Sequence, residues 1–267
     1  MAEVIDIDDP TDPRVDDFRD LSNADRRPDL PGRKGLVIAE GVVVVQRMLD
    51  SRFAPSALLG VGKRFETLAG DLADRDLPYY RASAEVMAEV VGFHLNRGVL
   101  AVAPRPAELT VDEALDGART VAVLEGVNDH ENLGSMFRNA AGLGADAVLF
   151  GDRCADPLYR RAVRVSMGHV LRVPFAQLPQ WPQSLDVVRD KGFQIIALTP
   201  NPAAMNLATA MTGEKVALLL GAEGPGLTEE AMRATDVRAR IPMSPGTDSL
   251  NVATAAAMAF YERVRTS

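Results

Sequence analysis

Short apolar runs alternate with segments of helical periodicity along most of the chain. Runs such as Leu36–Ile38 and Val99–Val102 predict strands, and segments whose apolar residues recur every three or four positions predict helices. The predicted helices of the first half cover residues 42–51, 65–72 and 84–91. The polar stretch 103–110, interrupted by two prolines, is the predicted linker. These features predict a small α/β unit at residues 30–104.

Five further apolar runs follow the linker. They lie at residues 121–124, 147–150, 171–173, 194–198 and 216–220. Continuous apolar runs are typical of strands buried on both faces, as in a parallel sheet that helices cover on both sides. A final amphipathic helix is predicted at 251–263, with Ala256, Ala259 and Phe260 among its apolar positions. We therefore expect a second α/β domain, with a parallel sheet, at residues 111–267.

The charge is unevenly distributed along the chain. Residues 1–29 contain ten acidic residues and four arginines, so most of the formal net charge of −8 lies in this segment. Its composition predicts a partly flexible acidic tail that leads into a short helix near residues 15–23. The stretch 153–172 instead contains five arginines and one acidic residue. That stretch predicts a local basic surface suited to nucleic acid, although a solvated helix face is the simpler interpretation.

Composition also excludes several classes of protein. No apolar run approaches the ~20 residues that a membrane-spanning helix needs, and we expect no secretory signal because the first residues are acidic. The single cysteine, Cys154, allows no internal disulfide, which favours a cytoplasmic protein. The three histidines lie far apart, so no metal site is predicted. The glycine fingerprint of ordinary dinucleotide-binding domains is missing, which argues against an oxidoreductase.

Polar residues and glycines follow two of the predicted strands. Asn132 and Arg138 come after the strand at 121–124, at the start of a predicted helix. The strand at 216–220 runs directly into Gly221-Ala222-Glu223-Gly224-Pro225-Gly226. Glycines at a strand end let the backbone approach a ligand closely, and we expect that a side chain at position 224 would enter this loop. A plain turn would show similar glycines but would not explain Glu223.

A third block precedes the final helix. Ile241, Met243 and Leu250 offer an apolar surface, and Ser249 and Asn251 supply short hydrogen-bonding side chains at the helix start. Helix capping by Ser249 or Asp248 is compatible with a role in a site.

In order and spacing, these three blocks resemble the signature motifs of the SpoU (TrmH-like) branch of the knotted RNA methyltransferases. The resemblance implies transfer of a methyl group from S-adenosylmethionine to a ribose 2′-hydroxyl, a trefoil knot and a homodimer that buries positions of the final helix. It implies a catalytic set, which comprises Asn132, Arg138, Glu223, Ser249 and Asn251. It also implies a cofactor-binding set, which comprises Leu198, Thr199, Gly221, Gly224, Ile241, Met243 and Leu250.

The role of Arg138 depends on physical chemistry as well as on the resemblance. A guanidinium is effectively never deprotonated in proteins, so we interpret Arg138 as a group that orients RNA and stabilises the forming alkoxide, and not as a base. Glu223 is expected to hold Arg138 or Asn251 in place. The family often has a proline where this chain has His130, which affects the expected loop shape.

The first domain resembles the ribosomal-protein-like substrate domain that precedes the catalytic domain in relatives acting on ribosomal RNA. Candidate RNA-binding residues are Arg97, Arg153, Arg160 and Arg164. Ribosomal RNA is the favoured substrate. A tRNA methyltransferase and a catalytically silent RNA-binding assembly factor remain as alternatives.

Overall fold

The computed structural model describes residues 2–22 and 34–266, which form two compact units. Unit 1 comprises Met1–Ala107 and Leu158–Arg172, and unit 2 comprises Glu108–Pro157 and Val173–Ser267. Residues 23–33 lie outside the described residues, and with them the end of the predicted acidic segment and the start of the predicted first domain.

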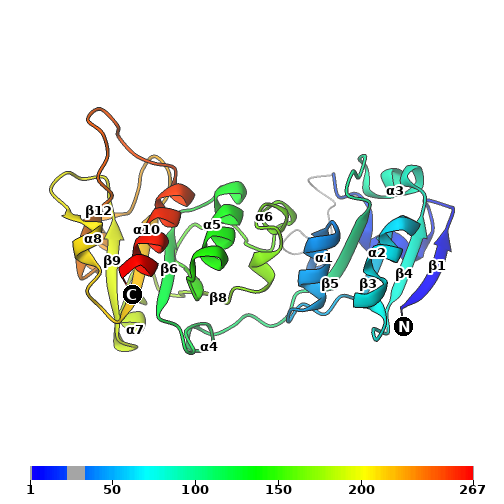
Figure 1. Cartoon of the computed structure of the whole chain (residues 1–267), viewed down its shortest axis with the longest axis horizontal. Helices are drawn as coiled ribbons and strands as arrows, with labels where there is room; N and C mark the ends of the chain where they lie inside the picture. The colour runs from blue at the N-terminus through cyan, green and yellow to red at the C-terminus, as the bar shows by residue number, and fades with distance from the viewer. Residues whose placement is uncertain (1, 23–33, 267) are drawn as a thin grey trace. The chain divides into compact units, whose positions relative to one another are not determined.

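Unit 1 contains a five-stranded mixed sheet in the order β1-β4-β3-β5-β2 (Figure 1). Its strands are β1 (Glu3–Ile7), β2 (Leu36–Glu40), β3 (Ala57–Gly60), β4 (Pro78–Ala82) and β5 (Val99–Pro104). Its helices include α1 (Val42–Leu49), α2 (Gly62–Leu72) and α3 (Ala84–Val91). The three helices predicted for this region are confirmed, because the apolar residues of each helix face the buried side of the sheet. Helix α2 begins at Gly62, three residues before the start of the predicted range.

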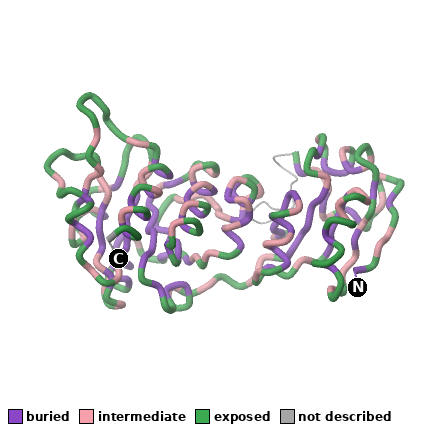
Figure 2. Tube along the Cα trace, viewed as in Figure 1, coloured by how far each residue is buried: buried purple, intermediate pink, exposed green. Residues whose placement is uncertain are grey.

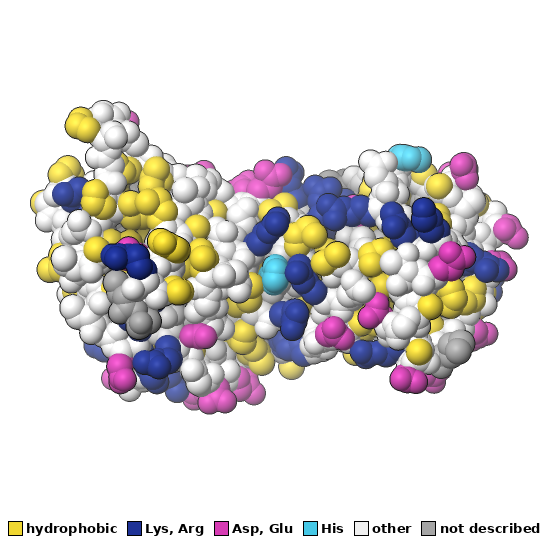
Figure 3. All heavy atoms as spheres, in the orientation of Figure 1, with side chains coloured by type: hydrophobic (Ala, Val, Ile, Leu, Met, Phe, Trp, Pro, Cys, Tyr) yellow, Lys and Arg dark blue, Asp and Glu magenta, His cyan; other side chains and the backbone are white. Residues whose placement is uncertain are grey.

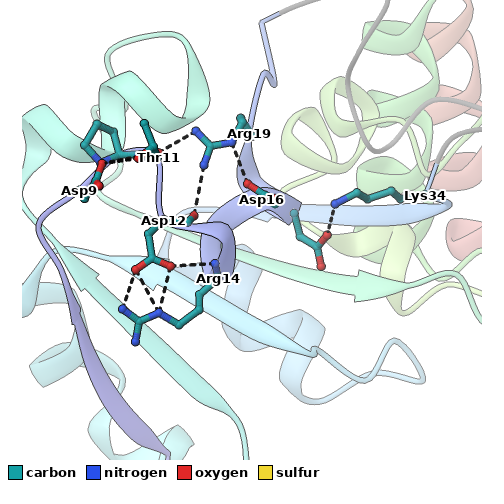
Figure 4. A network of polar contacts seen from close by, with 9 residues as sticks. Asp9, Thr11, Asp12, Arg14, Asp16, Arg19 and Lys34 are labelled. Atoms are coloured by element: carbon teal, nitrogen blue, oxygen red, sulfur yellow. Dashed lines mark hydrogen bonds and ion pairs between the residues drawn. The ribbon is translucent and has the colours of Figure 1, made fainter.

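The acidic N-terminal segment is ordered over its described part, so the expectation of a frayed tail is wrong for residues 2–22. Strand β1 pairs in parallel with β4, and the 3-10 helix η1 (Pro13–Phe18) buries Val15 and Phe18 in the core of unit 1. Local ion pairs offset the negative charge. Asp12 accepts hydrogen bonds from Arg14, and Arg19 donates to Asp16 (Figure 4). Apolar residues between the acids therefore dock this segment.

Unit 1 also contains Leu158–Arg172, a segment from far along the sequence. The prediction had assigned all residues from 111 onward to the second domain. Helix α6 (Arg160–Val165) packs against β2, and the 3-10 helix η2 (His169–Leu171) contacts α1. Gly168 packs closely on Val44, because a Cβ at this glycine would lie 3.1 Å from a Val44 methyl group. The strand predicted at 171–173 is wrong, because Leu171 ends η2 and the strand of this region forms further along, at Phe175–Gln177.

Unit 2 contains a seven-stranded sheet, in the order β10-β12-β9-β11-β6-β7-β8, whose pairings are all parallel. Its strands are β6 (Thr120–Glu125), β7 (Ala147–Phe150), β8 (Phe175–Gln177), β9 (Phe193–Leu198), β10 (Met205–Asn206), β11 (Lys215–Gly221) and β12 (Val237–Arg240). The central strands are buried along their length, as the continuous apolar runs predict (Figure 2).

Helices cover both faces of this sheet. They are α4 (Val111–Ala114), α5 (His130–Leu143), α7 (Leu185–Asp190), α8 (Leu207–Ala210), α9 (Glu229–Arg233) and α10 (Val252–Thr266). One core cluster joins alternate strand residues to α4, α7 and α9, while α5 and α10 pack together and contact β6, β7 and β11. The predicted parallel sheet with helices on both sides is confirmed. The knot stays a prediction.

Helix α10 buries three residues that we expected at a subunit contact. Ala256, Ala259 and Phe260 are fully buried within the single chain, so they are not available to a partner. The exposed apolar side chains of α10 are instead Met258, Tyr261 and Val264. The sequence pattern did not distinguish the two faces because α10 is apolar on both.

Candidate cofactor cavity and polar cluster

A cavity of about 330 Å³ lies at the carboxyl ends of β9, β11 and β12 in unit 2. Parallel strands bring their carboxyl ends to one edge of the sheet, and ligands bind there in many α/β folds. The lining combines the 198–200 segment, the loop after β11, and the segment between β12 and α10. It consists of Leu198, Thr199, Pro200, Leu220, Gly221, Ala222, Glu223, Gly224, Pro225, Gly226, Leu227, Met232, Ile241, Met243, Ser249, Leu250, Val252 and Ala255.

The cavity brings together the complete set of residues predicted to bind the cofactor. The members of that set come from three separate stretches of sequence: Leu198 and Thr199; Gly221 and Gly224; and Ile241, Met243 and Leu250. Sequence reasoning missed the side chains that complete the apolar wall, notably Leu220, Met232 and Val252. The only sequence signal at these positions is the apolar pattern, and residues of the hydrophobic core show the same pattern.

Two glycines of the loop after β11 play different roles. A Cβ on Gly221 would lie 2.4 Å from the backbone of Gly226 and Leu227, so the loop closes tightly on this position. Gly224 has a φ of +88°, and nothing lies within 4 Å of the position its Cβ would take. A side chain at position 224 would therefore meet no protein atom, but it would lie at the wall of the cavity, so its effect on cofactor binding stays a prediction. The positive φ also favours glycine at this position.

A cluster of polar side chains joins the three sequence motifs beside the cavity. The side-chain amide of Asn251 donates to Oδ1 of Asn132 at 2.7 Å and to Oε1 of Glu223 at 2.6 Å. The backbone N–H of Val252 lies 3.4 Å from the same Glu223 oxygen. Three predicted catalytic residues that are far apart in sequence are thus in direct contact. Of the two partners expected for Glu223, the structure shows Asn251.

Asn251 has a second role as the cap of α10. Its Oδ1 accepts hydrogen bonds from the N–H groups of Ala253 and Thr254 at 3.0 and 3.1 Å. The cap predicted at Asp248 or Ser249 is therefore formed by a residue further along the chain. Ser249 lines the cavity instead. Because one amide both caps the helix and contacts two motifs, the start of α10 is fixed relative to Asn132 and Glu223.

Arg138 lies on α5, the helix that also carries Asn132. Its side chain is exposed and makes no hydrogen bond or ion pair within the described part of the chain. The next residue, Asn139, ties α5 to α10 by donating to the Ala253 carbonyl at 2.9 Å. The helix that presents Arg138 is thus anchored, while its guanidinium is available to an external anion.

The candidate RNA-binding arginines are divided between the two units. Arg153 belongs to unit 2, where its Nε lies 3.3 Å from an Asp152 carboxylate oxygen, whereas Arg97, Arg160 and Arg164 belong to unit 1. Of the five arginines in the predicted basic stretch 153–172, only Arg153 lies in unit 2, because the chain passes into unit 1 at residue 158. The basic surface itself stays a prediction.

Within unit 1, the three arginines also differ. Arg160 is only 18% exposed, and its guanidinium lies 3.0 Å from the buried carboxylate of Glu40. Arg97 approaches the same carboxylate at 3.8 Å and is 43% exposed, and Arg164 is exposed. Lys and Arg side chains gather around α1 and α6 on this face of unit 1 (Figure 3). Arg160 is therefore tied to a structural partner, and Arg164 is the most available of the three.

Other site types are not apparent in the described residues. No group of three or more His, Cys, Asp or Glu residues within 2–22 and 34–266 is arranged to hold a metal ion. Burial raises the pKa of the Cys154 thiol, whose Sγ lies 3.3 Å from the Leu124 carbonyl. None of the helices in this part of the chain is both long and apolar enough to cross a bilayer.

Comparison with known proteins agrees with this geometry. The model of the SpoU rRNA methylase family matches residues 119–261, which include the cavity and the polar cluster. The chain belongs to this family.

Relatives and solved structures extend the match beyond the catalytic unit. An uncharacterized tRNA/rRNA methyltransferase of Mycobacterium tuberculosis is 65% identical over 98% of this chain and 92% of its own length. The 23S rRNA (guanosine-2′-O-)-methyltransferase RlmB of a Burkholderia species is 32% identical over 58% of this chain and 63% of its own length. The AdoMet-bound rRNA methyltransferase of Sinorhizobium meliloti is 26% identical, covers 98% of both chains and superposes with a TM-score of 0.80.

Proposed function

We propose that this RNA methyltransferase transfers a methyl group from S-adenosylmethionine to a ribose 2′-hydroxyl of ribosomal RNA. The observation that carries the proposal is the contact of Asn132, Glu223 and Asn251 beside a cavity that gathers the complete predicted cofactor-binding set. Support for the ribose as acceptor comes from the RlmB relative, whose name specifies 2′-O-methylation of guanosine in 23S rRNA.

The cavity suits S-adenosylmethionine in chemistry as well as in position. Leu198, Ile241 and Leu250 provide an apolar surface for the adenine, and the glycines after β11 leave backbone groups accessible for hydrogen bonding. When bound, the cofactor supplies an electrophilic methyl group on a sulfonium ion. The methyl carbon forms a bond to the 2′-oxygen as its bond to sulfur breaks, and the hydroxyl proton is released.

The residues of the chain align the acceptor and stabilise charge. Asn251 holds Glu223 and Asn132 in a fixed arrangement at the cavity, which limits reorganisation during the reaction. Arg138 contributes a permanent cation that orients an RNA oxygen and stabilises negative charge developing on the 2′-oxygen. Because the guanidinium stays protonated, the proton passes to another acceptor.

The test is methyl transfer from tritium-labelled S-adenosylmethionine to total RNA, followed by separation of ribosomal RNA from tRNA and digestion of each fraction to nucleosides. We expect the label in a 2′-O-methylated nucleoside derived from ribosomal RNA. Label in a tRNA nucleoside would favour the tRNA alternative, and label on a base would refute ribose methylation. Absence of transfer with intact cofactor binding would favour the catalytically silent assembly factor.

Unit 1 and the exposed face of α10 complete the proposal. Unit 1 binds the RNA through exposed cations such as Arg97 and Arg164, and the enzyme works in the cytoplasm as a homodimer. The dimer contact uses Met258, Tyr261 and Val264, the exposed apolar residues of α10. Tyr261→Asp places a charge in this contact and should yield a monomer in sedimentation velocity. Ala256 is buried within the chain, so a substitution there would not test the dimer contact.

A further inference from the structure

A second cavity in unit 2 shares a wall with the cofactor cavity. It has a volume of about 320 Å³, within the range of pockets that hold small ligands (about 300–1,000 Å³). Glu223, Pro225 and Gly226 line both cavities, so the two cavities adjoin along the loop after β11. The second cavity also receives residues from the ends of β6 and β7, which are Glu125, Asn128 and Arg153.

The floor of this cavity is fixed by a buried carboxylate. Glu125 is 1% exposed, and its oxygens accept hydrogen bonds from the Trp181 indole N–H at 2.6 Å and from the Thr228 N–H and hydroxyl at 2.8 Å. Thr228 also accepts from the N–H of Ala231 and so caps α9. Glu125 thereby connects the end of β6 to the far end of the loop shared by the two cavities. The cavity is preorganised.

The walls offer unused hydrogen-bonding groups. The side-chain amide of Asn128 is exposed and makes no hydrogen bond to any residue the structure describes. Glu223 uses Oε1 for Asn251, and its Oε2 accepts no hydrogen bond within the same described residues. At the rim, Arg153 is 66% exposed and adopts a left-handed backbone conformation with a φ of 55°, which is unfavourable for a residue with a side chain.

This arrangement suits a nucleoside and its phosphate. The carboxylates of Glu125 and Glu223 would repel a phosphate inside the cavity, and Oε2 of Glu223 can accept a hydrogen bond from a base or ribose donor. An amide supplies both a donor and an acceptor, which is the usual way to read a base edge. Arg153 at the rim is placed where a phosphate can remain in solvent. Enzymes that modify a nucleotide and proteins that read RNA often use an unstacked nucleotide in this way.

We propose that the second cavity binds the target nucleotide of the RNA, with Asn128 and Arg153 as specificity-determining residues. The inference rests on the proposed function, because it places the acceptor ribose next to the methyl donor, where the two cavities adjoin. Asn128 belongs to none of the predicted sets, and Arg153 was predicted only as a general RNA-binding residue. Asn128 contacts the base or ribose, and Arg153 contacts the phosphate.

The single tryptophan of the chain provides a direct readout, because its indole N–H contacts the floor of this cavity. We would titrate each of the four ribonucleoside 5′-monophosphates while S-adenosylhomocysteine saturates the cofactor cavity, and record tryptophan emission. At least one nucleotide should change the emission of the wild type saturably. Asn128→Ala and Arg153→Ala should each raise the midpoint tenfold or more.

Arg119→Ala is the matched control, since Arg119 is an exposed arginine of unit 2 outside both cavities, 3.8 Å from Glu214. Its midpoint should equal that of the wild type. No saturable change with any nucleotide, or equal midpoints for all variants, would overturn the proposal. Single-turnover methyl transfer to ribosomal RNA distinguishes failure of the second-cavity proposal from failure of the proposed function. If the wild type and all three variants react equally, the second cavity is refuted while the proposed function stands. If the wild type transfers no methyl group to any RNA, the proposed function itself fails.

Discussion

The polar cluster of unit 2 and the arginines of unit 1 are built in opposite ways. Asn251 contacts Asn132 at 2.7 Å and Glu223 at 2.6 Å, so it fixes the positions of both. In unit 1, Arg160 is held by a buried carboxylate, while Arg164 extends into solvent. A site of direct contacts should respond sharply to single substitutions, whereas a charged surface should respond weakly and additively.

Substitution of Arg138 should show the largest effect on catalysis. If Arg138 behaves instead like a surface arginine, the contrast between the two units fails at this residue. We expect Arg138→Ala to lower the single-turnover rate by ~10²-fold or more, because the lost cation stabilises charge that appears only in the transition state. Affinity for S-adenosylmethionine, measured by calorimetry, should change little. Arg138→Lys should recover little activity, since an ammonium cannot contact two oxygens as a planar guanidinium does.

Loss of RNA affinity with an unchanged single-turnover rate at saturating RNA would instead make Arg138 a docking residue. A fully active Arg138→Ala variant would refute both roles. Arg119→Ala serves again as the exposed control, because its side chain lies outside the cavities.

A pair of glycine substitutions sharpens the account of the cofactor cavity. In Gly221→Ala, the new Cβ meets backbone at 2.4 Å, so the loop must move. An overpacking cost of about 1–3 kcal/mol corresponds to a loss of roughly fivefold to 150-fold in cofactor affinity. In Gly224→Ala, the new Cβ meets nothing, and the strain of the positive φ acts equally on free and bound protein. Its affinity should fall less than that of Gly221→Ala.

Calorimetry with S-adenosylhomocysteine distinguishes the two variants, and circular dichroism checks that both are folded. Equal affinities for the two variants would contradict the tight closure of the loop at Gly221.

The smallest effects are expected in unit 1. Arg164→Ala should weaken RNA binding only a few fold. The slope of log affinity against log salt concentration should fall by about one, as expected for the loss of one phosphate contact. Arg160→Ala should act mainly on stability, at a cost of about 2 kcal/mol, because it removes the cation nearest to the buried Glu40. Filter binding at several salt concentrations and thermal unfolding separate these effects. A reversal of the two phenotypes would show that Arg160 contacts RNA.

The same contrast explains what the sequence could predict. The cofactor cavity was predictable because its residues lie in three motifs at strand ends, and the parallel topology brings such ends together. Arg160 was misjudged because its partner, Glu40, is 120 residues away. The docking of β1 was missed because its short alternating pattern lies within an acidic segment. Glu125 and Asn128 carried no motif signal, and only the fold shows that they face a cavity.

The central claim is that the chain methylates a ribose in ribosomal RNA. The most direct measurement maps 2′-O-methylation across total RNA from cells with and without the gene, using the resistance of a 2′-O-methylated linkage to alkaline cleavage. We predict that loss of the gene removes ribose methylation at a defined position in ribosomal RNA and that the wild-type gene restores it, whereas Arg138→Ala does not. An unchanged ribose-methylation map, with a methyl group lost from a base instead, would contradict the account.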